Sequence, residues 1–194
     1  MKRWQPSIMT LAAMFPAQAA LAHTAGAQGA GFAAGLSHPF IGLDHLLAML
    51  AVGLWAAQLG GRAMLRVPLA FMTLMALGCA LALGGLPLPA VETGIAVSVL
   101  VLGLLIALAA RFPLAVGMLL AGVFALFHGH AHGQELPQAA SAFLYSTGFL
   151  LATGVLHAAG AGLGILFSRG VAANWVRVMG GGIAAAGLVL WTGV

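Results

Sequence analysis

Two short clusters of histidine and acidic residues stand out in an otherwise apolar chain. The first spans residues 38–45 and contains His38, Asp44 and His45. His38 precedes a proline, which favours an extended or turn conformation, whereas Asp44 suits the first turn of a helix. A turn over residues 39–42 would fold His38 back over Asp44 and His45. One short segment would then supply three candidate metal ligands.

The second cluster contains His128, His130, His132 and Glu135, and we expect it in the connection after a membrane span. If this segment is helical, His128 and His132 share one face; if it is extended, all three histidines point the same way. Either geometry brings imidazoles together. Imidazole with carboxylate suits a borderline divalent ion such as Ni²⁺, Co²⁺, Zn²⁺ or Cu²⁺. A chain with one cysteine offers no thiolate cluster.

The composition indicates a membrane protein. Of the 194 residues, 62% are apolar and only 5% are charged, whereas a soluble domain carries about 25% charged residues. Soluble, disordered and nucleic-acid-binding proteins are thereby excluded, and a polytopic membrane protein remains. The sequence has no nucleotide-binding P-loop, which argues against direct use of ATP by this chain.

The N-terminal segment resembles a secretory signal peptide. A positive N-terminus precedes an apolar stretch over residues 8–20, and an A-x-A pattern ends at Ala22. We therefore expect residues 1–22 to be removed, which leaves 23–194 as a single transmembrane domain. The free amine beside the His23 imidazole is then a candidate N-terminal metal ligand.

The hydropathy pattern predicts an all-α bundle of about six transmembrane spans. We expect these spans at residues 43–59, 67–83, 91–110, 113–127, 139–167 and 175–194.

The charges predict how the bundle is oriented. In the expected mature chain, the arginines follow the first, third and fifth spans, namely Arg62, Arg66, Arg111, Arg169 and Arg177. Because positive loops stay in the cytoplasm, we expect a multi-pass protein of the bacterial inner membrane with both mature termini outside.

Glu92 would then lie at the outer end of the third span, beside the two clusters. His157 would lie deep in the fifth span as a candidate ligand on the inner path. We expect the methionines mainly to pack the helices.

The two clusters together resemble the HupE/UreJ family of nickel/cobalt permeases. The H-x5-D-H pattern of the first cluster and the F-H-G-x-A-H-G-x-E pattern over 127–135 both match without a gap. In that family these motifs are taken to bind the transported ion. The resemblance implicates six residues by position, and His130 occupies a variable position of the pattern. The six are His38, Asp44, His45, His128, His132 and Glu135. Glu92 and Phe71 match acidic and aromatic positions expected in the family, which makes Phe71 a candidate pathway aromatic.

We therefore expect an inner-membrane permease for divalent transition-metal ions, with Ni²⁺ first and Co²⁺ or Zn²⁺ as further candidates. Transport would be secondary or by facilitated diffusion, with an outward-facing His/Asp/Glu site. The expected partners are the ion and the lipid bilayer, with no permanent cofactor, nucleic acid or enzymatic activity. The resemblance adds cytosolic nickel chaperones of hydrogenase or urease maturation.

Two alternatives remain open from the sequence. A non-transporting, periplasm-facing metal sensor or assembly factor would bind metal without moving it. A membrane metalloenzyme with histidine boxes, such as a di-iron hydroxylase, would use the His128-x3-His132 spacing for an iron centre.

Overall fold

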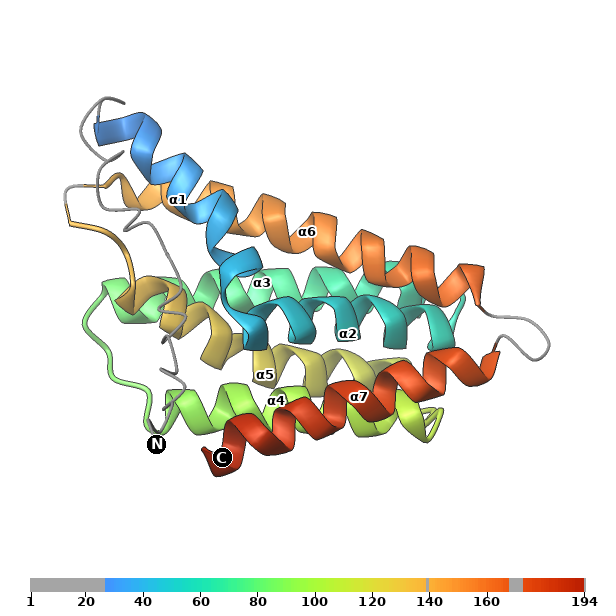
Figure 1. Cartoon of the computed structure of the whole chain (residues 1–194). Helices are drawn as coiled ribbons and strands as arrows, with labels where there is room; N and C mark the ends of the chain where they lie inside the picture. The colour runs from blue at the N-terminus through green and yellow to red at the C-terminus, as the bar shows by residue number, and fades with distance from the viewer. Residues whose placement is uncertain (1–26, 139, 168–172, 194) are drawn as a thin grey trace, which may run out of the picture.

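The computed structural model describes residues 27–138, 140–167 and 173–193, and within these ranges the chain is all helical. The predicted signal peptide, its cleavage point and His23 lie outside the described residues. The described part contains seven helices and no strand, which confirms the all-α prediction (Figure 1). They are α1 (Ala27–Ile41), α2 (Leu43–Leu59), α3 (Ala63–Leu83), α4 (Val91–Ala107), α5 (Leu114–Gln134), α6 (Ala142–Leu166) and α7 (Ala173–Thr192).

Four of these helices, α3, α5, α6 and α7, are long and apolar enough to cross a membrane. The pair α1 and α2 is bent by 79° and gives a fifth span if it is counted as one broken element. A helix lies over each of the six ranges expected from hydropathy, but α4 has only 17 residues. It ends three residues before the expected boundary because the chain turns at Ala109, whose φ is 50°.

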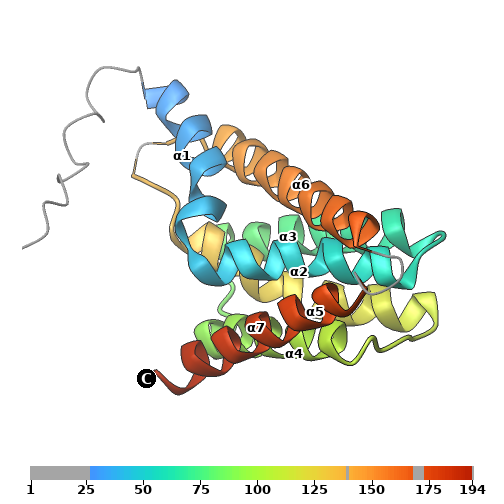
Figure 2. The same ribbon diagram turned by 45° about the vertical axis from the view of Figure 1, so that its right-hand side comes forward.

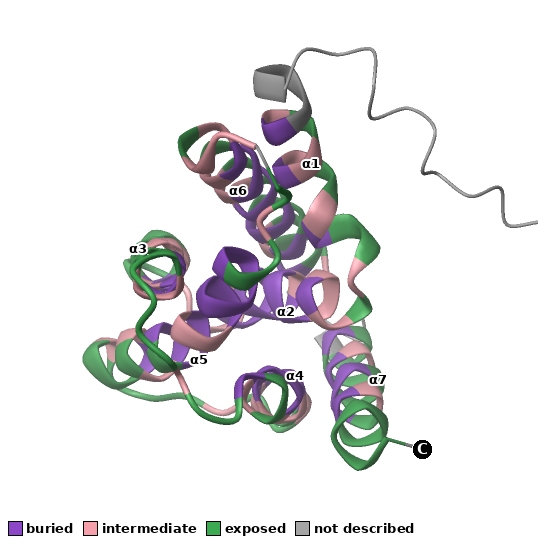
Figure 3. Cartoon of the chain, turned by 90° about the vertical axis from the view of Figure 1, so that its left-hand side faces the viewer, coloured by how far each residue is buried: buried purple, intermediate pink, exposed green. Residues whose placement is uncertain are grey.

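Consecutive helices from α2 to α7 run in alternating directions (Figures 1 and 2). The most extensive contacts join α3 to α5, α4 to α7, and both α1 and α2 to α6. Helix α2 passes through the centre of the bundle and is buried along most of its length (Figure 3). It therefore contacts helices on several sides while the outer helices present apolar residues such as Leu119 and Phe143 to the surroundings.

The bundle has one acidic end and one basic end. The three acidic residues of the chain, Asp44, Glu92 and Glu135, line one cavity at the end where α2 and α4 begin and α5 finishes. At the opposite end, Arg62 and Arg111 line a shared hollow, and Arg111 lines another with Arg177. The expected orientation in the membrane depends on this polarity.

Close packing of α2 on α6 requires a residue without a side chain at Gly160. A Cβ added there would overlap the carbonyl oxygen of Leu50, whereas a Cβ at Gly162, on the same helix, would meet nothing within 4 Å. Small residues of this kind let membrane helices approach each other closely.

The substitution Gly160→Ala is expected to destabilise the bundle by about 1–3 kcal/mol, because α2 and α6 must move apart. The matched change Gly162→Ala should instead leave stability equal or raise it by up to about 1 kcal/mol, since alanine favours the helix. Thermal unfolding of both variants in detergent would measure the difference. Equal effects of the two substitutions would contradict the proposed packing.

Candidate metal site

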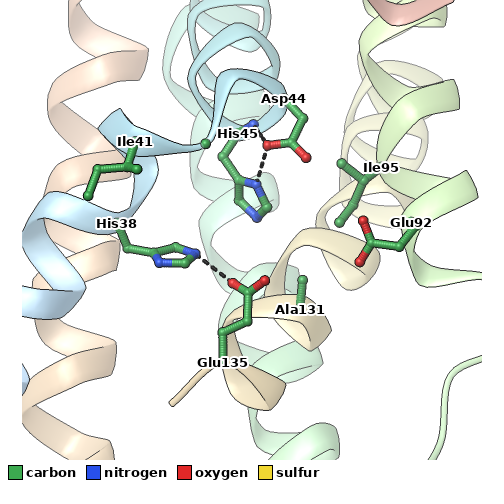
Figure 4. Close-up of a pocket in the computed structure, with 9 residues that line it drawn as sticks. His38, Ile41, Asp44, His45, Glu92, Ile95, Ala131 and Glu135 are labelled. Atoms are coloured by element: carbon green, nitrogen blue, oxygen red, sulfur yellow. Dashed lines mark hydrogen bonds and ion pairs between the residues drawn. The ribbon is translucent and has the colours of Figure 1, made fainter. Parts of the chain in front are cut away.

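The position of His38 depends on a bend between two helices. The expectation that His38 is extended or in a turn is wrong, because α1 continues through Pro39 and ends at Ile41. The chain then bends at Gly42, which has an extended conformation with φ −77° and ψ 114°. The bend of 79° between α1 and α2 turns His38 toward the first turn of α2 (Figure 4). The three candidate ligands of the first cluster, His38, Asp44 and His45, therefore lie close together, but through two bent helices and not through a turn.

The second cluster belongs to a helix and not to a connection. Helix α5 does not end near residue 127 but extends to Gln134, so His128 and His132 lie one turn apart on the same face. Glu135 is the residue that caps the C-terminus of this helix. The expected location in an outer connection is therefore wrong, and the helical alternative is the one adopted.

The two clusters meet at three imidazoles. One nitrogen from each of His38, His45 and His132 lies within 4.8 Å of the other two. The ring centroid of His45 lies 4.7 Å from that of His132 and 4.8 Å from that of His128. Histidines from α1, α2 and α5 therefore form one contiguous group, which we call the histidine cluster: His38, His45, His128 and His132.

Asp44 orients the ring of His45. Its Oδ1 atom lies 2.8 Å from His45 Nδ1 and also accepts a hydrogen bond from the His45 backbone N–H. A carboxylate acceptor fixes the proton on Nδ1, which leaves Nε2 with a free lone pair. His45 Nε2 is buried and has no hydrogen-bond partner in the described part of the chain. The carboxylate–imidazole pair is the usual arrangement behind a metal-bound histidine.

Ser98 orients His128 in the same way. The Ser98 hydroxyl donates to the carbonyl of Ile95 at 2.7 Å and so accepts from His128 Nε2 at 2.8 Å. The lone pair of His128 is then on Nδ1, which is buried and has no partner among the described residues. Ser98 was not among the residues expected at the site, since a single serine in an apolar helix forms no motif.

His132 has both ring nitrogens buried without a hydrogen-bond partner among the described residues. Its ring stacks on Phe149 with centroids 4.3 Å apart and the planes parallel. Buried polar groups are nearly always hydrogen-bonded, so several unpartnered imidazoles at one place need an explanation. A cation bound among them would provide the missing interactions.

Glu135 brings a negative charge to the edge of the cluster. Its Oε2 lies 2.7 Å from His38 Nε2, and the side chain is half exposed. The hydrogen bond from His38 lowers the pKa of Glu135, although burial acts in the opposite direction. Glu135 therefore remains a carboxylate under mildly acidic conditions.

A cavity of about 230 Å³ connects the cluster to the outside. It opens at the acidic end, and Figure 4 shows His38, Asp44, His45, Glu92 and Glu135 around it. Because a water molecule occupies about 30 Å³ in the liquid, several waters fit, enough for a cation that keeps part of its hydration shell. Glu92 and Glu135 are exposed at this end, Asp44 and His38 are partly buried, and His45, His128 and His132 are buried.

The remaining candidates lie outside the cluster. His130 Nε2 is 3.0 Å from the carbonyl oxygen of Leu86, toward the connection between α3 and α4. The ring of Phe71 lies between two histidines, with its centroid 5.8 Å from that of His128 and 5.2 Å from that of His157. His157 is thus buried farther along the bundle, beyond Phe71.

Comparison with known proteins agrees with the two motifs. The family model described as HupE / UreJ protein matches residues 11–190. The chain belongs to the HupE/UreJ family. It is 48% identical over 184 residues to "Protein HupE" of Rhizobium leguminosarum bv. viciae, which covers 95% of this chain and 96% of that protein. No solved structure matches the chain. The family is related to nickel/cobalt transport, so membership indicates a transport protein and not an enzyme.

The geometry predicts different roles for two neighbouring histidines. His132→Gln is expected to weaken Ni²⁺ binding by more than about tenfold, because a buried ligand is lost. His130→Gln should leave the dissociation constant within about threefold, since His130 points away from the cluster. Calorimetric titration of both detergent-solubilised variants would measure this. An equal loss of Ni²⁺ affinity in the two variants would contradict the assignment of His132, and not His130, to the histidine cluster.

Ser98 is expected to act through His128. Ser98→Ala should weaken Ni²⁺ binding by about 10–100-fold, as the loss of an outer-shell partner does in other metal sites. The control is Thr73→Ala, which removes an exposed hydroxyl that donates to the carbonyl of Leu69 on its own helix. If both variants bind Ni²⁺ like the parent protein, the orienting role of Ser98 is wrong.

Proposed function

We propose that the protein is an inner-membrane permease for divalent transition-metal ions, with Ni²⁺ as its first substrate and Co²⁺ as a second. The observation that carries this proposal is a group of buried imidazole nitrogens that have no hydrogen-bond partner among the described residues, beside a cavity with three carboxylates. Membership of the HupE/UreJ family supports it. The ion is cargo, and no resident cofactor is needed.

The carboxylates and the imidazoles would act in sequence. Asp44, Glu92 and Glu135 would attract the cation to the cavity, because acidic groups at a low-dielectric mouth raise the local cation concentration. The imidazoles would then replace water in its coordination shell. Nitrogen ligands favour late transition ions over Mg²⁺ and Ca²⁺, which prefer oxygen.

The membrane potential can supply the driving force. An inside-negative potential favours entry of a dication by about 4.6 kcal/mol per 100 mV, twice the value for a single charge. Secondary transport and facilitated diffusion both fit this driving force. On the inner side, nickel chaperones of hydrogenase or urease maturation would take up the ion.

We propose that the acidic end faces outward and the basic end faces inward, so that both termini of the mature chain lie outside. The positive-inside rule supports this orientation. Single cysteines in a Cys79→Ser background would test it at two exposed positions, Leu86 in the connection before α4 and Leu108 directly after α4. In intact spheroplasts, Leu86→Cys should react with an impermeant maleimide and Leu108→Cys should react only after lysis. The reverse pattern would contradict the orientation.

Uptake of radioactive Ni²⁺ into proteoliposomes with an inside-negative potential tests the function. The parent protein should show saturable uptake, and Asp44→Asn at matched insertion should reduce it by more than about tenfold, since it loses the carboxylate that orients His45. Binding without uptake by the parent protein would favour the sensor or assembly factor. A coupled di-iron centre with oxygen consumption would favour the metalloenzyme.

A further inference from the structure

A stripe of buried residues on α6 leads inward from the histidine cluster. Tyr145, Phe149, Thr153 and His157 are spaced four residues apart, and all are at most 3% exposed. This spacing places them on one face of the helix, about 6 Å apart. The ring of Tyr145 lies 6.2 Å from that of His38, and Phe149 stacks on His132. The outer half of the stripe therefore lines the histidine cluster, and the inner half continues beyond it.

Two methionine sulfurs converge at the third residue of the stripe. Thr153 Oγ1 lies 3.2 Å from Met49 Sδ and 3.9 Å from Met75 Sδ. All three side chains are fully buried, and they come from α6, α2 and α3. A hydroxyl has only one proton, so it donates to one sulfur at a time. The other thioether remains without that hydrogen bond.

His157 lies one turn farther in, at the end of the stripe. Both of its ring nitrogens are buried without a hydrogen-bond partner in the described part of the chain. The Phe71 ring packs edge-on against it at 5.2 Å, and Gly53 of α2 lies directly against its backbone carbonyl. Leaving a buried imidazole unpartnered is costly, whereas an apolar side chain of similar size would incur no such cost. A purely structural role does not account for a histidine at this position.

We propose that Met49, Met75, Thr153 and His157 form a second, interior binding site for the transported ion, inward of the histidine cluster. This inference rests on the proposed transport function. Thioethers and imidazole suit a soft or borderline late transition ion and exclude Mg²⁺ and Ca²⁺. The site contains no carboxylate, so it binds a dication weakly. Conduction through several sites requires such weak binding, because the ion must also leave.

Measurements of Ni²⁺ uptake and of equilibrium Ni²⁺ binding distinguish this site from the histidine cluster. His157→Leu and the double variant Met49→Leu/Met75→Leu should each lower Ni²⁺ uptake by more than about tenfold. Equilibrium binding by the histidine cluster should stay within about twofold in both variants, and the thermal unfolding midpoint of His157→Leu should be unchanged or higher. Leucine conserves the methionine volume, and Met72→Leu, on the same helix as Met75, is the matched control. Uptake equal to the parent, or an equal loss of binding and uptake, overturns the proposal. His157→Gln replaces His157→Leu if the latter does not fold.

Methyl NMR tests the site without relying on transport. Paramagnetic Ni²⁺ should broaden the Met49 and Met75 ε-methyl signals of the parent protein more strongly than those of His157→Leu, which retains the histidine cluster. Equal broadening in the two proteins overturns the interior site. If the parent protein shows no uptake at all, the transport function fails. The NMR comparison then tests the interior site without uptake data. Broadening of the two methyl signals that depends on His157 supports the site, and the absence of such broadening overturns it.

Discussion

The bend at Gly42 is the constraint on which the site depends. It sets α1 at 79° to α2, so that His38 approaches His132 of α5 while His45 remains on the first turn of α2. Packing of α1 along α6 maintains this arrangement, since a Cβ on Gly35 would overlap the backbone of Tyr145. Two motifs about 90 residues apart in the sequence thereby meet at one end of the bundle.

Burial of the imidazoles determines what the site can bind. Asp44 and Ser98 each occupy one nitrogen of a histidine and leave the other with a free lone pair. These lone pairs have no hydrogen-bond partner in the part of the chain that the structure describes, and a bound cation would satisfy them. The carboxylates remain at the mouth of the cavity, where they are partly hydrated, so the site combines an acidic entrance with a neutral interior.

Much of this architecture is predictable from the sequence. Composition and hydropathy predict the helices, and the motifs predict that His38, His45 and His132 share a site. The helix through Pro39 is not predictable, because contacts with α6 override the local preference of the residue before a proline. The direction of His130 also depends on tertiary packing. Ser98 has no local signature. Tyr145 and His157 are detectable by their spacing on α6, once the extent of that helix is known.

X-ray absorption at the nickel edge, on protein loaded with one equivalent of Ni²⁺, would identify the ligands of the bound ion. We expect a coordination shell with several imidazole ligands, whose imidazole scattering falls in His132→Gln and is kept in His130→Gln. A spectrum like that of hydrated nickel, or one unchanged by His132→Gln, would contradict a site built from both motifs.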